Sequence, residues 1–107
     1  MASITSEQMN VLLFRLKNNL EIITDYMDAE AQKQKEQQLY YYIQSAMEFI
    51  EREGITLDLD SISDGELVVM YASWLYDKRK DGVAVMPRML RYNLNNRVFA
   101  EKVNSNV

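Results

Sequence analysis

The feature that most constrains the fold of this chain is its very small number of residues that interrupt helices. Its 107 residues include three glycines and a single proline, Pro87. Glycine and proline are the strongest local interruptions of regular structure, and the sequence is otherwise rich in Leu, Met, Glu, Gln and Lys, which favour helices. We therefore predict an all-α fold, in which a few helices are joined by short connections.

The first part of the chain predicts one helix, followed by a segment with no single assignment. Thr5 is followed three residues later by Gln8, the pattern of a capping box, with Ser6 as an alternative N-cap. Apolar residues then recur at helical spacing as far as an Asn-Asn pair at 18–19. The next stretch, "LEIITDYM" (20–27), fits an extension of that helix, a short strand or an ordered loop.

A long central helix is predicted over residues 28–53. Its first half is polar on all sides, and an apolar stripe begins only at Leu39, so we expect its second half to face the core. Three consecutive tyrosines at 40–42 are either one buried and two partly exposed rings, or a contact surface. Gly54 stands where a left-handed C-cap belongs.

A third helix is predicted over residues 64–80. Ser63 and Glu66 form a second capping-box pattern at its start, and the Asp-Gly pair at 81–82 ends it. The connection before it, residues 55–62, alternates apolar and polar residues, so a short strand is an alternative there.

A last helix is predicted to begin after Pro87, which suits the first turn of a helix. Leu90 and Leu94 share its core face, and residues 98–107 are expected to form a flexible arm. We therefore predict a single domain over residues 1–107. It is a small bundle of four helices, or five, with one long central helix.

Catalytic and metal chemistry has little to use in this sequence. There is no histidine and no cysteine, so the commonest general base, the commonest metal ligand and all thiolate sites are missing. The acidic stretch at 58–66 fails as a calcium loop, since Ile62 occupies a ligand position and Gly65 comes two places late. Carboxylate pairs such as Asp58 and Asp60 are expected to be solvated. We expect a non-enzyme without cofactor or metal, and without a membrane span, because no apolar run approaches ~18 residues.

Charge is divided unevenly along the chain. Residues 1–76 carry five basic and thirteen acidic side chains, a net charge of −8, whereas residues 77–107 carry seven basic and three acidic ones, a net charge of +4. Half of the twelve basic residues lie in one short segment, at Lys78, Arg79, Lys80, Arg88, Arg91 and Arg97. Such polarity in one small domain suggests two surfaces with different partners.

Three explanations of this basic segment compete. In the plainest, the Lys-Arg-Lys run at 78–80 complements the negative end of a helix dipole, and the later arginines are simply on the surface. In the second, the arginines after Pro87, with Tyr92 and Asn95, contact nucleic-acid phosphates, although the net charge of −4 opposes long-range attraction. In the third, the arginines pair with acidic side chains of a neighbouring protein, including further copies packed head to tail in a ring.

The C-terminal part of the sequence resembles a known family. The stretch "YASWLYDKRKDGVAVMPRMLRYNLNNRVFAEK" is similar to the C-terminal half of the head–tail connector (adaptor) proteins of long-tailed double-stranded DNA phages. Those proteins typically have an aromatic helix, a Gly-containing loop, a Met-Pro turn and an Arg/Leu-rich helix. The matching positions here are Trp74, Tyr76, Arg79, Gly82, Met86, Pro87, Leu90, Arg91, Asn95, Asn96 and Arg97. The segment "AMEFIEREG" (46–54) likewise resembles the end of the family's long helix.

This resemblance implies a structural role in phage assembly. Family members form a ring of about a dozen copies beneath the portal, which extends the DNA channel and docks the tail or a stopper. The implied partners are other copies of the chain, the portal protein, the tail or stopper protein, and passing double-stranded DNA without sequence-specific contact; no membrane is implied. The implied location is the head–tail junction of the virion, after assembly in the bacterial host cytoplasm.

The same resemblance implies a protein interface on the C-terminal segment. Its candidate residues are Arg79, Arg88, Arg91, Asn95, Asn96, Arg97 and Phe99. Charge reversal of Arg91 and Arg97 is expected to abolish assembly and to leave the monomer folded. Acidic residues at 48–66 either line the channel or meet a neighbour's arginines. The alternative function, from a different class, is a small helical nucleic-acid-binding regulator that uses the basic last helix.

Overall fold

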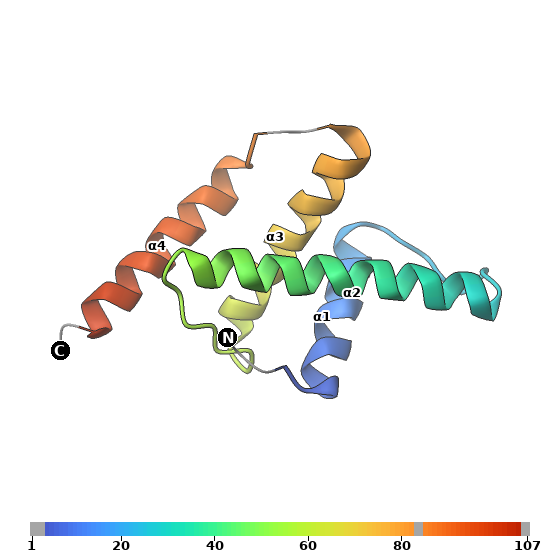
Figure 1. Ribbon diagram of the computed structural model, residues 1–107, viewed down its shortest axis with the longest axis horizontal. Coiled ribbons are helices and arrows are strands. Elements are labelled where there is room, and N and C mark those ends of the chain that lie inside the picture. The colour runs from blue at the N-terminus through green and yellow to red at the C-terminus, as the bar shows by residue number, and fades with distance from the viewer. Residues whose placement is uncertain (1–3, 83–84, 106–107) are drawn as a thin grey trace.

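The computed structural model of the protein describes residues 4–82 and 85–105. Within these residues the chain forms four α-helices and no strand (Figure 1). The helices are α1, Ser6–Asn19; α2, Ala29–Arg52; α3, Ile62–Asp81; and α4, Arg88–Ser105. The all-α class and the four predicted helices are confirmed, and no fifth helix forms in the part of the chain that the structure describes.

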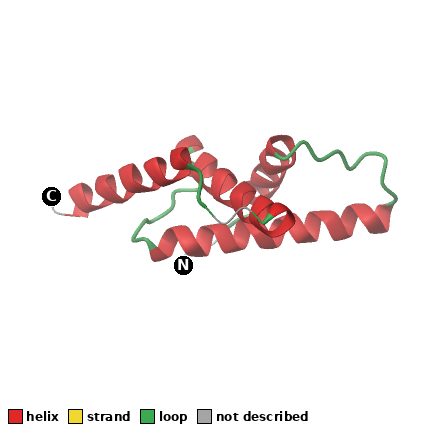
Figure 2. Ribbon diagram, turned by 90° about the horizontal axis from the view of Figure 1, so that it is seen from above, coloured by secondary structure: helices red, strands yellow, loops and turns green. Residues whose placement is uncertain are grey.

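Helix α2 is the longest element and lies across the others (Figure 1). It packs against α1 and α3, which also contact each other, whereas α4 packs chiefly against α3. The polar N-terminal half of α2 and the C-terminal half of α4 extend toward opposite ends of the long axis (Figure 2). The molecule is flat and elongated, 52 × 31 × 18 Å, with a radius of gyration of 14.5 Å against about 13 Å for a compact domain of this length.

One apolar core is built from all four helices and from the connection between α2 and α3. The stripe predicted for α2 is confirmed, with all of its members buried: Leu39, Ile43, Ala46, Met47 and Ile50. Helix α4 contributes Leu90 and Leu94, and Val98 is partly buried against the same core. Helix α3 is buried on more sides than a single stripe through Leu67 and Tyr71 implies, because the other three helices all pack against it.

Helix α1 begins at its predicted cap, and α2 begins one residue after the predicted position 28. The Thr5 hydroxyl accepts a hydrogen bond from the Gln8 backbone N–H at 3.1 Å, and the Gln8 side chain accepts one from the Thr5 backbone N–H at 3.0 Å. Asp28 caps α2 by accepting a hydrogen bond from the Ala31 N–H at 2.8 Å. These bonds satisfy backbone donors that have no partner inside their helix.

The start of α3 differs from the prediction. Its N-cap is Ser61, whose hydroxyl accepts from the Asp64 N–H at 3.4 Å, so the helix begins two residues earlier than predicted. The predicted box of Ser63 and Glu66 does not form, because the Glu66 carboxylate pairs with an arginine of α1 instead. The Asp64 carboxylate turns back to accept the Asp58 N–H at 2.8 Å, which fixes the connection that precedes the helix.

The structure also decides three further segments, for which the sequence either left several structures open or predicted a different one. Residues 20–27 form an ordered loop, not a helical extension or a strand, and the connection at 55–61 likewise has no strand. The segment 98–107, predicted to be a flexible arm, is instead helical to the end of α4; the last two residues lie outside the described part. An ion pair between Arg97 and Glu101, one turn apart, supports this extension of α4.

Gly54, which follows α2, has a φ of 96°, a backbone angle that favours glycine. Replacing it with Ala is expected to lower the free energy of unfolding by about 1 kcal/mol or more, because a Cβ is strained at that angle. Gly54→Asn is expected to cost less, since Asn tolerates positive φ better. Urea denaturation measures both values, and a Gly54→Ala variant as stable as the original chain would contradict this account.

Candidate functional site

The seven predicted interface residues do not form one cluster. Six lie on α4, and one, Arg79, lies near the end of α3. Arg91 and Arg97 turn toward the rest of the chain and form ion pairs with it. The remaining four are exposed along α4: Arg88, Asn95, Asn96 and Phe99.

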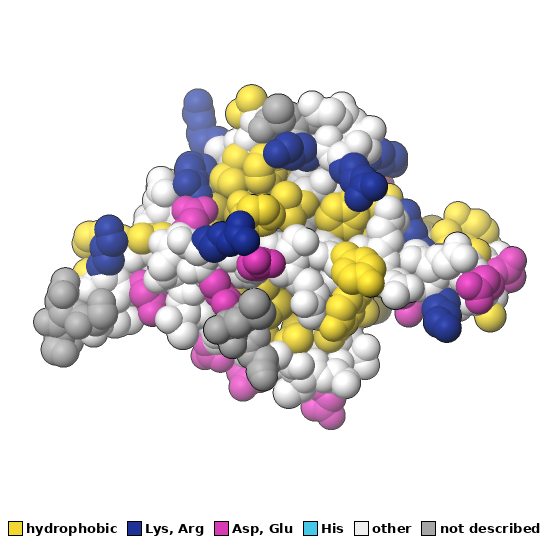
Figure 3. Space-filling view, in the orientation of Figure 1, with side chains coloured by type: hydrophobic (Ala, Val, Ile, Leu, Met, Phe, Trp, Pro, Cys, Tyr) yellow, Lys and Arg dark blue, Asp and Glu magenta, His cyan; other side chains and the backbone are white. Residues whose placement is uncertain are grey.

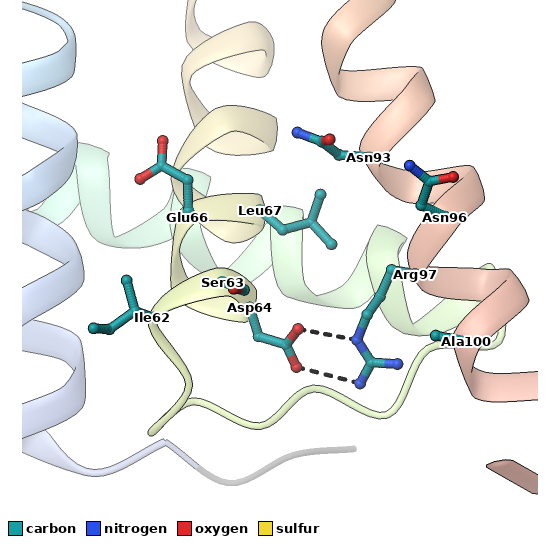
Figure 4. A pocket seen from close by; sticks show the side chains of 9 residues that line it. All are labelled: Ile62, Ser63, Asp64, Glu66, Leu67, Asn93, Asn96, Arg97 and Ala100. Carbon is teal, nitrogen blue, oxygen red and sulfur yellow. Dashed lines mark hydrogen bonds and ion pairs between the residues drawn. The ribbon is translucent and has the colours of Figure 1, made fainter.

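Arg97 joins three segments that are distant in the sequence. Its Nε donates to Asp64 Oδ1 at 3.0 Å, its Nη2 donates to the Thr56 carbonyl at 2.8 Å, and its Nη1 donates to Glu101 Oε2 at 2.6 Å. Figure 4 shows the paired contacts with Asp64. The Asp64 side chain is only 6% exposed, so this guanidinium compensates a carboxylate that water hardly reaches.

The hydrogen bonds of Arg97 shift pKa values in the directions that keep the partners charged. The pKa of Arg97 is raised above its usual value, chiefly because the guanidinium donates to Asp64, while burial opposes the shift. The pKa of Glu101 is lowered, chiefly because Arg97 donates to its carboxylate, with a further contribution from a hydrogen bond with Thr56. Arg97 and Glu101 are therefore both charged across the neutral range.

Arg91 makes a second, more exposed link between α4 and the end of α2. Its Nη2 lies 2.8 Å and 2.7 Å from the two carboxylate oxygens of Glu53, the residue that caps the C-terminus of α2. The Arg91 and Glu53 side chains are 44% and 27% exposed, so water screens this pair more than it screens the Arg97 pair. The two arginines together hold α4 against the end of α2 and the connection that leads to α3.

These contacts change the interpretation of the basic segment. The sequence predicts that Arg91 and Arg97 meet acidic side chains of a neighbouring protein, but Glu53, Asp64 and Glu101 of the same chain supply the carboxylates. The expectation that the monomer stays folded after both charges are reversed is therefore revised. Reversal would place new carboxylates beside existing ones, and one of those is buried.

The outward side of α4 carries a largely exposed row of side chains, which we call the α4 stripe: Met89, Tyr92, Asn96, Phe99 and Val103. Met89, Tyr92 and Phe99 are 62%, 61% and 69% exposed. The five positions repeat at intervals of three and four residues, as do residues on the side of a helix that packs against another helix. Only Asn96 and Phe99 are among the predicted interface residues. The spacing of all five positions is visible in the sequence and could have predicted the whole stripe.

A second surface lies between α2 and α3, and we call it the aromatic groove. It has a volume of about 330 Å³ and is lined by Tyr42, Ser45, Phe49, Leu75, Lys78 and Arg79. Figure 3 shows apolar side chains gathered over this part of the molecule, with Lys and Arg around them. Arg79, predicted to act with the α4 residues, therefore belongs to a different surface.

Aromatic rings and cations pack closely beside this groove. Phe49 stacks on Tyr71 with ring centroids 5.9 Å apart, and Tyr71 meets Trp74 edge-on at 5.6 Å. Lys78 Nζ lies 5.2 Å from the centre of the Trp74 ring, and the Arg52 guanidinium carbon lies 5.3 Å from the centre of the Phe49 ring. Much of the ring surface is therefore already in contact with other rings and with cations of the same chain.

A third hollow, of about 530 Å³, lies between the start of α3 and α4 (Figure 4). Its lining includes Ile62, Leu67 and Asn93, together with the paired Asp64 and Arg97. Because those two charges already satisfy each other, the hollow offers mainly apolar surface to a ligand. Among the described residues there is no cluster of three or more His, Cys, Asp or Glu that could hold a metal ion. None of the described helices is both long and apolar enough to span a membrane.

Replacing Arg97 with Met keeps an apolar stem and removes the charge that compensates Asp64. The free energy of unfolding is expected to fall by about 3 kcal/mol, because a buried carboxylate loses its partner. Arg91→Met is the matched control on the same helix and is expected to cost less than about 1 kcal/mol, since Glu53 remains accessible to water. Urea denaturation of both variants tests this order, and equal losses would contradict it.

Comparisons with protein-family models, with curated proteins and with solved structures find no match for this chain.

Proposed function

We propose that this chain is a structural subunit of a phage or prophage head–tail connector. Copies of it form a ring beneath the portal at the head–tail junction, extend the DNA channel and dock the tail or a stopper protein. The observation that carries the proposal is the α4 stripe, an exposed surface on a helix whose other side is fixed to the bundle by ion pairs. The resemblance of residues 71–102 to connector proteins supplies the class of assembly.

The composition of the α4 stripe supports docking on another protein. Exposed apolar side chains that occur singly are ordinary on a protein surface, whereas a contiguous row of them is typical of an interaction site. Tyr92 and Phe99 are aromatic, and aromatic side chains are enriched in the buried centres of interfaces. Arg91 and Arg97 hold the helix in position before binding, which lowers the entropy lost when the stripe is covered.

The shape of the subunit supports a ring. Helix α4 and the loop before α2 lie toward opposite ends of the 52 Å long axis (Figure 2). A subunit that uses two different surfaces makes head-to-tail contacts with its neighbours. Such contacts close into a ring where the rotation between copies permits it, and they form a filament otherwise.

The alternative, a nucleic-acid-binding regulator, has weaker support. It relies on the arginines of the last helix, and Arg91 and Arg97 are engaged by carboxylates of the same chain. Phosphate binding by these two side chains would break the pairs that hold α4 in place. Of the three arginines on that helix, Arg88 alone forms no ion pair within the described part of the chain, and one arginine provides little of the usual phosphate affinity.

The proposal is tested first by native mass spectrometry of the purified chain over a wide range of concentration, alone and with the portal protein encoded by the same genome. A connector subunit is expected to give a discrete closed oligomer of about a dozen copies, on its own or on the portal. Negative-stain images are expected to show a ring with an open centre. A chain that is monomeric alone and gives no ring with the portal would contradict the proposal.

The double variant Tyr92→Ser, Phe99→Ser is expected to stay folded and to bind the portal about 30-fold more weakly, as for the loss of about 2 kcal/mol at the centre of an interface. Both side chains are more than half exposed, so the free energy of unfolding should change little. Phe14→Ser on α1 is the matched control, because Phe14 is 66% exposed but lies away from α4. Unchanged portal binding by the double variant would exclude the α4 stripe as the docking surface.

A further inference from the structure

One end of the molecule carries acidic side chains together with exposed apolar ones. This acidic tip, residues 21–30, comprises the loop before α2 and the first residues of that helix (Figure 1). Its acidic residues are Glu21, Asp25, Asp28 and Glu30. No basic residue occurs between positions 18 and 32. Two apolar side chains project from the tip, Ile23 with 65% and Tyr26 with 79% of its surface exposed.

The acidic tip is ordered. Thr24 is buried, its carbonyl accepts the Met27 N–H at 3.0 Å, and its hydroxyl accepts from the Gln32 side chain at 3.4 Å. The first bond closes a turn within the loop and the second joins the loop to the start of α2, while the Tyr26 ring stays in solvent. An aromatic side chain held outward by a fixed loop loses little conformational freedom on binding, which makes it a preorganised contact residue.

The aromatic groove has the complementary character. Its volume of about 330 Å³ is at the low end of the usual range for ligand pockets, so it suits one ring rather than a large ligand. Lys78 and Arg79 lie in its lining and give it positive charge. Arg79 is exposed and forms no ion pair with any described residue. A partner that offers an aromatic ring next to a carboxylate would fit both properties.

The acidic tip cannot enter the aromatic groove of its own chain. Gln32 contacts the loop, and Tyr42, the nearest groove residue on the same rigid helix, lies ten residues further along. At 1.5 Å per residue this separation is about 15 Å, which is longer than a tyrosine side chain can span. The tip that fills a groove must therefore belong to another copy.

We propose that Tyr26 of one copy occupies the aromatic groove of the next copy, with Asp25 beside Arg79. The inference rests on the proposed ring and names the contact that builds it. The acidic tip and the aromatic groove are different surfaces, and in the proposed ring this heterologous contact repeats from copy to copy. Charge complementarity directs each acidic tip toward a groove, because two acidic tips repel each other.

Single-stranded nucleic acid is the competing occupant, since it binds to exposed rings flanked by cations. The geometry favours the acidic tip. Phe49 and Tyr71 are stacked on each other, and Lys78 lies over Trp74, so these rings offer few free faces for successive bases. A concave groove of this size accepts one inserted ring more readily than it supports a row of stacked bases.

Disulfide trapping tests the contact directly, because the natural chain has no cysteine. The pair Asp25→Cys, Arg79→Cys replaces the proposed ion pair by two thiols and keeps Tyr26. Oxidation is expected to give a ladder of covalent trimers and larger species on a denaturing gel. The matched control, Asp25→Cys with Arg88→Cys, moves the second thiol to α4 and is expected to give dimers at most. Adding Tyr26→Ser to the trapping pair is expected to reduce species above the dimer at least ten-fold.

The outcomes separate this contact from the proposed function. A ladder in the trapping pair, absent from the control and lost with Tyr26→Ser, supports the contact. No species above the dimer, or an equal ladder in the control, overturns it. A closed ring in native mass spectrometry together with no ladder would overturn the contact and leave the connector function standing. No ladder, with binding of a single-stranded oligonucleotide that Arg79→Ala abolishes, would assign the groove to nucleic acid instead.

Discussion

The arrangement of the helices depends on one buried carboxylate and the guanidinium that compensates it. Asp64 accepts the backbone N–H of Asp58 and two donors of Arg97, so a single side chain ties the start of α3 to the connection before it and to the last helix. Helix α4 has few core residues of its own, chiefly Leu90 and Leu94, and hydrophobic contact with so few side chains allows several orientations. A buried charge allows only the orientation that pairs it. The Arg97 pair therefore selects which side of α4 faces the core and leaves the α4 stripe outward.

The basic residues of this segment have two kinds of surroundings that the sequence does not distinguish. Arg91 and Arg97 are used within the fold, where Glu53, Asp64 and Glu101 neutralise them. Lys78, Arg79 and Lys80 remain at the end of α3, close to the negative end of its helix dipole and beside the aromatic groove. A concentration of arginine in an acidic chain is thus partly a consequence of holding α4 in place. Only the remainder is available to a partner, and this reduces the weight of the nucleic-acid interpretation.

Local features could be predicted from the sequence, and long-range ones could not. The cap at Thr5 and the left-handed position at Gly54 depend on residues a few positions apart, and both are as predicted. The predicted start of α3 is wrong because Ser61 and Ser63 are both good N-cap residues. The choice between them follows from the tertiary contacts of Asp64. Those contacts form only when α4 folds over the connection, and no sequence pattern marks them. The spacing of side chains along a helix is a local feature, so it could reveal the α4 stripe. The pairing of Arg91 and Arg97 depends on tertiary contacts and could not be predicted in this way.

The internal pairing also explains how a small acidic protein could keep copies in a single orientation. After Arg91 and Arg97 are neutralised, much of the remaining polarity lies between the acidic tip and the basic end of α3, which are separate surfaces. Contacts of tip against tip, or of basic end against basic end, would bring like charges together and are unfavourable. Head-to-tail packing instead places unlike charges together at each contact. The uneven charge of the chain, −8 over residues 1–76 and +4 over residues 77–107, therefore favours contacts between unlike surfaces, which are the contacts that a ring uses.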